Sequence, residues 1–236
     1  MAKVYLSPSD QTSNKYAYGN TNEAVQCRLI ADACEVALKR CGFEVKNNKT
    51  DSMEARCSES DKWGADLHVP IHTNAYNKSV TGTRIFCYSK SSKGYKAAHA
   101  IFDVLAPLTP GESENVSVNA SLYETRYPNA PTAYIEVDFH DVADVAKWII
   151  ENAVLIGEAI CEGICNYFGK QYIPNVVAPV PVYCVELGEY DTNKEADAML
   201  GGVYARLSTA EAALNEAQNA LDELETVLRK AQIVER

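Results

Sequence analysis

The sequence predicts an α/β fold, a mostly parallel sheet flanked by helices, followed by a linker and a long coiled-coil-like helix at the C-terminus. Short β-branched and aromatic runs alternate with helical segments in the order β-α-β-α-β-β-α-β-α, and strands separated by helices usually pair in parallel. Three prolines then fall within residues 172–183, where no helical period is present. We therefore expect an α/β domain over residues 1–170, a Pro-rich linker over 171–183 and a helical segment over 184–236.

Each element of the α/β domain has its own local signal. Strands are expected where apolar residues alternate or run together, and helices where they recur every three or four residues. In chain order, these patterns predict a strand over 3–7, a helix over 22–42, a strand over 43–47, a helix over 52–64, strands over 65–74 and 82–89, a helix over 92–108, a strand over 132–139 and a helix over 141–169. Asn22 or Thr21 is suited to cap the first helix, Gly42 and Gly64 to end the first two, and Pro107 to close the third.

The C-terminal segment carries a heptad pattern. Its apolar positions are spaced alternately by three and four residues: Leu200, Val203, Leu207, Ala210, Leu214, Ala217, Leu221, Leu224, Leu228 and Ala231. Such a register, held over several heptads, is typical of a coiled coil and predicts a homo-oligomer formed through this helix. The alternative is a helix that lies on the α/β domain through the same apolar stripe.

Composition and charge exclude two broad classes of protein. The formal net charge is −10, whereas a protein that binds nucleic acid through its phosphates needs a basic surface. No run of 18 apolar residues is present, so no membrane span is expected. The N-terminus "MAKVYLSPSD" is predicted to be a first strand rather than a signal peptide, so we expect synthesis in the cytoplasm without a signal peptide.

The eight cysteines are expected to be reduced and buried. Cys27, Cys34 and Cys41 are seven residues apart along one face of the first predicted helix, where a thiol serves as a small apolar side chain. Cys161 and Cys165 repeat the pattern on the last helix of the domain. The chain has no Cys-x-x-Cys pair, so a zinc-finger type of site is not expected.

The candidate site residues lie near the ends of predicted strands. The stretch "ADLHVPIHTNA" places His68 and His72 on one strand, about 13 Å apart at ~3.3 Å per residue, so one metal ion cannot bind both. His72 is nearer the strand's end and is the candidate ligand, whereas His68 is expected to be a neutral, hydrogen-bonded packing residue. Glu136 stands in the middle of an apolar strand, which is costly for a carboxylate unless it is paired or functional. Asp10 follows the first strand, and ligands in such sheets bind at the carboxyl ends of the strands.

Four stretches together resemble a known family: "YLSPSDQTSNKYAYGNTNEA", "ADLHVPIHTNA", "APTAYIEVDFHDV" and "YFG". In order and spacing they are similar to the zinc-dependent N-acetylmuramoyl-L-alanine amidases of the cell-wall hydrolase and phage endolysin type, the amidase_3 family. The resemblance covers residues 3–169. It implies zinc as the cofactor, with Glu23 and His72 as two of its ligands and Glu136 as the catalytic acid/base.

One position departs from the family pattern. Where the family has Gly-His after the first strand, this chain has "SPSDQ", and Asp10 falls at the position of the histidine ligand. Zinc accepts carboxylate oxygen, so Asp10 is the expected third ligand. His140 in "DFHD" is the alternative ligand or a group at the rim of the site, and Asn74 is a candidate for substrate binding.

The function implied by the resemblance is hydrolysis of peptidoglycan at the amide bond between N-acetylmuramic acid and L-alanine. The implied mechanism uses a metal-activated water with Glu136 as acid/base. One alternative is a catalytically impaired module that retains the fold and binds cell-wall muropeptides. Another is a structural protein in which the coiled coil matters most. As a hydrolase, the protein is expected to act on the cell wall, outside the cell, after release, as a lysis enzyme of a bacterium or phage does.

Overall fold

The computed structural model describes residues 1–49, 52–112 and 115–175. The predicted helical segment 184–236, with its coiled coil and oligomer, lies outside these residues, as does the predicted linker from residue 176 onward. Among the helices that are described, none has both the length and the apolar character needed to cross a membrane.

The described residues form a six-stranded sheet in the order β2-β1-β3-β6-β4-β5. Its strands are β1 (Lys3–Pro8), β2 (Glu44–Asn47), β3 (Leu67–Asn74), β4 (Arg84–Cys87), β5 (Asn115–Val118) and β6 (Tyr134–Phe139). Every pairing is parallel except that of β4 with β6. The predicted α/β fold with a mostly parallel sheet is confirmed.

The helices follow the predicted order. They are α1 (Glu23–Arg40), α2 (Met53–Trp63), α3 (Lys93–Leu105), the 3-10 turn η1 (Ala106–Leu108), α4 (Tyr123–Arg126), α5 (Ala143–Glu151) and α6 (Ala153–Phe168). The side chain of Asn22 caps α1 by accepting a hydrogen bond from the backbone N–H of Val25. Gly64 ends α2 at φ 70°, a left-handed conformation that glycine adopts at little cost. The predicted start and stop signals are therefore used as expected at these two helices.

Three local features differ from the sequence prediction. The edge strand β5 and the single-turn helix α4 were not predicted, since four polar and apolar residues in a row carry no measurable period. The one helix predicted over 141–169 is divided at Asn152, whose backbone departs from helical geometry at φ −120° and ψ 21°. The Asn152 side chain donates to the carbonyl of Trp148, a local hydrogen bond that competes with continuing the helix.

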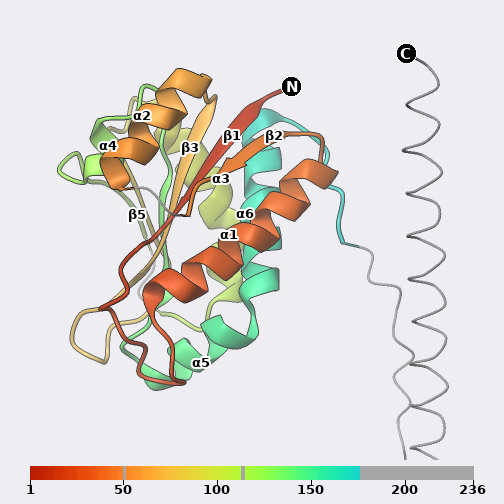
Figure 1. The fold of residues 1–236 in the computed structure, drawn as a ribbon. Helices are drawn as coiled ribbons and strands as arrows, with labels where there is room; N and C mark the ends of the chain where they lie inside the picture. Colours follow the sequence, from red (N-terminus) through yellow and green to blue (C-terminus); the bar gives the residue numbers. More distant parts are fainter. Residues whose placement is uncertain (50–51, 113–114, 176–236) are drawn as a thin grey trace, which may run out of the picture. The chain divides into compact units, whose positions relative to one another are not determined.

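The two faces of the sheet differ in chemistry. One face is apolar and fully buried, and α1, α3 and α6 pack on it: Val4, Leu6, Val69, Ile71, Ile135 and Val137. The alternate residues point to the other face and are mostly polar: Tyr5, Ser7, His68, His72, Tyr134 and Glu136. Figure 1 shows α2 and α4 on this second side of the sheet and α1 and α6 on the first. The candidate site residues of β3 and β6 therefore share the polar face.

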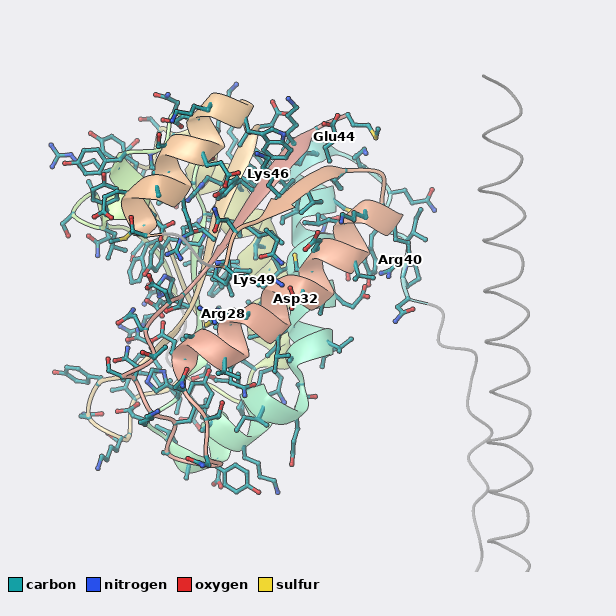
Figure 2. The ribbon with its side chains drawn as sticks, in the orientation of Figure 1. Arg28, Asp32, Arg40, Glu44, Lys46 and Lys49 are labelled. Carbon is teal, nitrogen blue, oxygen red and sulfur yellow. The ribbon has the colours of Figure 1, made fainter. Side chains whose placement is uncertain are left out.

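Charged side chains join α1 to the edge strand β2. Lys49 forms an ion pair with Asp32 at 2.6 Å, and the amide of Asn47 donates to Asp32 and to Glu35. Figure 2 shows Asp32 and Lys49 on neighbouring parts of this surface. These polar contacts and the apolar packing hold α1 against the sheet, so the first residue of the helix, Glu23, has a defined position over the strands.

The seven described cysteines are all buried and unbridged, as the sequence predicts. Cys27 and Cys34 have no exposed surface on α1. The sulfur atoms of Cys41, Cys161 and Cys165 lie within 4.8 Å of one another where the end of α1 meets α6. They fill the contact between the two helices.

We expect these thiols to be unreactive until the domain unfolds. Burial raises the pKa of the Cys57 and Cys165 thiols to about 12 each, so the reactive thiolate is scarce at neutral pH. In a Cys184→Ser variant, Ellman's reagent should label none of the seven described cysteines in the native state and all seven in denaturant. Rapid labelling of the native protein would contradict the packing described above.

Candidate active site

Three elements bring the candidate residues together. His72 on β3 is the register partner of Glu136 on β6, and the two strands are parallel neighbours. On the other side of β6, Glu136 pairs with Arg84 of the antiparallel strand β4. Glu23, the first residue of α1, reaches the same place. A helix N-terminus next to the carboxyl ends of strands is where α/β sheets bind their ligands.

Glu23 and His72 form a buried hydrogen-bonded pair. His72 Nδ1 lies 2.8 Å from Glu23 Oε1, and Asn14 donates to the second oxygen of Glu23 at 2.7 Å. Burial works to raise the pKa of Glu23, but the hydrogen bond and charge of His72 outweigh it and the pKa is lowered. Burial works to lower the pKa of His72, but Glu23 and the other carboxylates around the ring raise it. Tyr134 stacks on the His72 ring with centroids 4.7 Å apart, which fixes the plane of the imidazole.

Glu136 is a carboxyl group whose protonation changes near neutral pH. Burial is the main cause that raises its pKa to about 7. The negative charge of Glu23 adds to this rise, whereas the charges of His72 and Arg84 oppose it. Its Oε2 atom is buried without a hydrogen-bond partner among the described residues. A carboxyl group with such a pKa, beside a histidine and a second carboxylate, is suited to accept and return a proton.

The loop after β1 brings Gln11, and not Asp10, beside His72. Gln11 Nε2 lies 3.4 Å from His72 Nδ1, and Gln11 Oε1 accepts a hydrogen bond from Asn14, which also binds Glu23. The Asp10 carboxylate is half exposed, and its nearest charged partner is Arg56 Nη1 at 3.9 Å. Asp10 as a ligand stays a prediction, and the sequence carried no signal that Gln11 lies next to His72.

His140 and Asn74 lie where β3 and β6 end. His140 Nδ1 is 2.9 Å from the hydroxyl of Thr73, and its ring stacks on Tyr16 with centroids 4.9 Å apart. Burial lowers the pKa of His140, so the ring is neutral at pH 7. The backbone carbonyl of Asn74 accepts a hydrogen bond from the backbone N–H of His140. The side-chain oxygen of Asn74 accepts one from the backbone N–H of Ala75. His140 is thus held in a small aromatic and hydroxyl network next to the Glu23–His72 pair.

A second group of potential metal ligands lies on the same face of the sheet. Cys57, His68 and Glu124 offer ligand atoms within 4.8 Å of one another. His68 Nε2 is 3.1 Å from Glu124 Oε1, and its ring stacks on Tyr5, so the predicted hydrogen-bonded packing role of His68 agrees with its surroundings. Arg56, with 1% of its side chain exposed, lies 4.0 Å from Glu124 Oε2. Glu124 carried no local signal, since the single-turn helix α4 was not predicted.

Of these two groups, the one around Glu23 and His72 fits a divalent cation better. The carboxylates Glu23, Glu136 and Glu124 all raise the pKa of His72 there, so the ring lies in a negative field that favours a cation. Glutamate oxygen, histidine nitrogen and amide oxygen are all ligands of zinc or of harder divalent metals. At the second group, the guanidinium of Arg56 already supplies the positive charge, and a cation beside it would be repelled.

A family model, described as Amidase_3: N-acetylmuramoyl-L-alanine amidase, matches residues 6–166. The matched range begins within β1 and ends near the end of α6, so it includes every candidate site residue. No curated protein matches the chain.

Several solved structures have the same fold. The catalytic domain of CwlV, an N-acetylmuramoyl-L-alanine amidase from Bacillus (Paenibacillus) polymyxa var. colistinus, is 18% identical with a TM-score of 0.64, and the match covers 72% of this chain and 100% of that one. An N-acetylmuramoyl-L-alanine amidase from Clostridium difficile 630 is 21% identical with a TM-score of 0.64, covering 71% and 97%. The catalytic domain of the CD27L endolysin, which targets Clostridia difficile, is 19% identical with a TM-score of 0.58, covering 70% and 98%.

Proposed function

Because the chain belongs to the Amidase_3 family of N-acetylmuramoyl-L-alanine amidases, hydrolases of peptidoglycan, we propose that it cleaves the amide bond between N-acetylmuramic acid and L-alanine at the site of Glu23, His72 and Glu136. The observation that carries this proposal is the position of Glu136 directly beside His72 in the sheet, with Glu23 bonded to the same histidine. The protein's place of action would then be the cell wall.

Members of this family are typically zinc enzymes, and we propose that Glu23 and His72 hold a zinc ion here. Gln11 is the third protein ligand in this proposal, in place of Asp10, because its amide lies next to His72 Nδ1 whereas Asp10 faces Arg56. The oxygen and nitrogen of a glutamine amide are assigned from hydrogen bonding, so a half-turn of the group would present its oxygen to a cation. When bound, such a cation supplies Lewis acidity that polarises the amide carbonyl and makes water a stronger nucleophile.

The chain's own residues supply the proton transfers. Glu136 in its carboxylate form removes a proton from the attacking water and then returns it to the nitrogen of the leaving L-alanine. A pKa of about 7 suits both steps, since the group must bind the proton and release it at similar cost. Tyr134 keeps the His72 ring in plane, and the neutral His140 and Asn74 stand at the end of the strands, where they would contact the sugar or the peptide of the substrate.

The experiment that tests this function is digestion of purified peptidoglycan by the full chain in the presence of zinc. Cleavage of the proposed bond creates free α-amino groups on L-alanine, which appear after dinitrophenylation and hydrolysis as labelled alanine. New reducing sugar ends without labelled alanine would show a glycosidase activity instead. Binding of muropeptides without any labelled alanine would favour the alternative of an impaired wall-binding module.

A comparison of two neighbouring alanine variants tests the proposed ligand. Gln11→Ala should weaken zinc binding by about tenfold or more, because it removes a donor next to His72, whereas Asp10→Ala should leave it almost unchanged. Isothermal titration calorimetry with zinc measures both affinities. A large loss in Asp10→Ala with none in Gln11→Ala would return the third ligand to Asp10, as the family pattern first suggested.

Hydrolysis should decline on the acidic side of neutral pH. Glu136 acts as a base only when ionised, and its pKa is raised to about 7, so the active form is lost as the pH falls through that value. A bound cation favours the ionised carboxylate and moves this limb to lower pH. The pH profile of kcat/KM should therefore show an acidic limb at or below about pH 7. A rate that shows no acidic limb at any pH at which the zinc-loaded protein stays folded would contradict the assignment of Glu136 as the base.

A further inference from the structure

One carboxylate stands between the two histidines of β3. Glu124 Oε1 is 3.1 Å from His68 Nε2, and Glu124 Oε2 is 4.0 Å from His72 Nε2. Glu124 comes from the single turn α4, which packs against α2 on the polar face of the sheet. The two histidines are too far apart to share a metal ion, yet both approach the same side chain.

The two oxygens of Glu124 have different surroundings. Oε1 accepts hydrogen bonds from the hydroxyl of Ser7 and from His68. Oε2 has no hydrogen-bond partner among the described residues, although the whole carboxylate has no exposed surface. Burial works to raise the pKa of Glu124, but His68 and Ser7 lower it, and the charge of Arg56, 4.0 Å from Oε2, adds to their effect. One oxygen is thus fully engaged, and the other is held ready to accept a hydrogen bond.

The unpaired oxygen faces an unpaired nitrogen. His72 Nε2 is also buried without a hydrogen-bond partner among the described residues, while the other ring nitrogen, Nδ1, bonds Glu23. Native structures rarely leave buried polar atoms unpaired, so two such atoms facing each other call for an explanation. A movement of about 1 Å brings them from 4.0 Å to ordinary hydrogen-bond distance.

We propose that Glu124 is a positioning residue for His72, and that its Oε2 accepts the Nε2–H of His72 when a cation occupies Nδ1. This inference rests on the proposed zinc site. A metal ion takes the lone pair of Nδ1, so the single proton of the neutral ring must lie on Nε2, where it needs an acceptor. Histidines that bind metals usually donate their second N–H to a carboxylate or carbonyl, which fixes the ring and strengthens the ligand.

Ser7, His68 and Arg56 then have a common role. Ser7 and His68 fix Oε1, and Arg56 offsets the charge of the carboxylate, so that Oε2 remains directed at His72. His68 and Glu124 accordingly support the site at His72, and Cys57, which contributes nothing to that support, forms no metal site with them. Within "ADLHVPIHTNA", His68 therefore fixes the position of Glu124, and Glu124 accepts the Nε2–H of His72.

The test measures metal binding, not hydrolysis alone. Glu124→Gln keeps the shape of the side chain but removes the charge and offers a weaker acceptor. We expect zinc affinity, measured by calorimetry, to fall about 10- to 100-fold, with the stoichiometry unchanged. The visible absorption bands of the cobalt-substituted variant should also shift, because the basicity of the His72 ligand changes. Unfolding of the metal-free variant in urea shows separately how much stability the substitution removes.

Cys57→Ser is the matched control from the same group of side chains, and its zinc affinity and cobalt spectrum should equal those of the wild type. A Glu124→Gln variant with lowered stability but wild-type affinity and spectrum would overturn the inference. Loss of one of two bound zinc equivalents, in either variant, would do so as well, since it would make Glu124 or Cys57 a ligand of a second ion.

Two further results separate this inference from the proposed function. If Glu124→Gln does not fold, Ser7→Ala leaves the carboxylate in place but removes one of the two hydrogen bonds to its Oε1. We expect this variant to bind zinc roughly three- to tenfold more weakly, whereas a Glu124 that serves the fold alone would give no change. A wild-type chain that binds no zinc overturns the proposed metal site and the inference together. If the wild-type chain binds one zinc ion, and Glu124→Gln and Ser7→Ala bind it with the same affinity, the inference is overturned and the proposed metal site stands.

Discussion

Replacing Glu136 with glutamine should lower the rate of peptidoglycan hydrolysis by about 10²- to 10⁴-fold, the usual contribution of a general acid–base. Glutamine has nearly the same shape and fits between His72 and Arg84 in the sheet, but it cannot take a proton from water. The rate is measured by the appearance of labelled N-terminal alanine from purified cell walls. Zinc affinity should change little, because Glu23, His72 and Gln11 remain.

The control for this variant is Glu44→Gln, the same chemical change on the edge strand β2, which β1 and β3 separate from β6 (Figure 2). The Glu44→Gln variant should hydrolyse cell walls at the wild-type rate. If Glu136→Gln does so too, another residue is the base. If it loses zinc along with activity, Glu136 is a metal ligand rather than the proton carrier, and Gln11 need not be one.

Gly157→Val should destabilise the domain by about 3 kcal/mol, the upper end of the usual cost of overpacking a core. Gly157 lies on α6 where it crosses α1. A Cβ atom added there would be 2.7 Å from the Cβ of Ala33 and 2.7 Å from the backbone N of Cys34. Neither neighbour can move alone, so the two helices must separate. The free energy of unfolding in urea, followed by the fluorescence of Trp63 and Trp148, measures the effect.

Asn166→Val on the exposed side of the same helix is the control for Gly157→Val, since it adds a β-branched residue without a clash. It should alter the free energy of unfolding by no more than about 0.5 kcal/mol. Gly157→Ala should still destabilise, although alanine favours helix formation by about 1 kcal/mol over glycine. A neutral or stabilising Gly157→Ala would show that α1 and α6 can part without cost.

The strong periodic segments of the sequence were sufficient to predict most of the fold. The strand that carries His72 and the helix that begins at Glu23 are long and have clear apolar patterns, and the helix has a recognisable cap. What the sequence could not provide is the pairing of strands distant in the chain. The neighbourhood of His72 and Glu136 depends on β6 inserting between β3 and β4, which no local pattern encodes.

The surroundings of the candidate site residues were less predictable than the fold. The family pattern pointed to Asp10, but the direction of a loop side chain depends on tertiary partners, and here Arg56 of α2 lies beside Asp10 while Gln11 turns inward. Glu124 was missed for a similar reason. Its helix is one turn long, and a lone glutamate in a polar loop is indistinguishable from a solvated one until its burial is known.

The order in which the candidate site residues are translated decides when the site can form. Glu23, His72 and Glu136 are far apart in sequence, and the strand that carries Glu136 enters the middle of the sheet after β4 and β5 have been made. A ribosome emits the chain from its N-terminus, so the first two groups emerge well before the third. If Glu136 is the proton carrier, as we propose, the active site can form only after β6 has been translated and released from the exit tunnel. On this proposal the chain would gain activity late in synthesis, when the strand order of the sheet is completed.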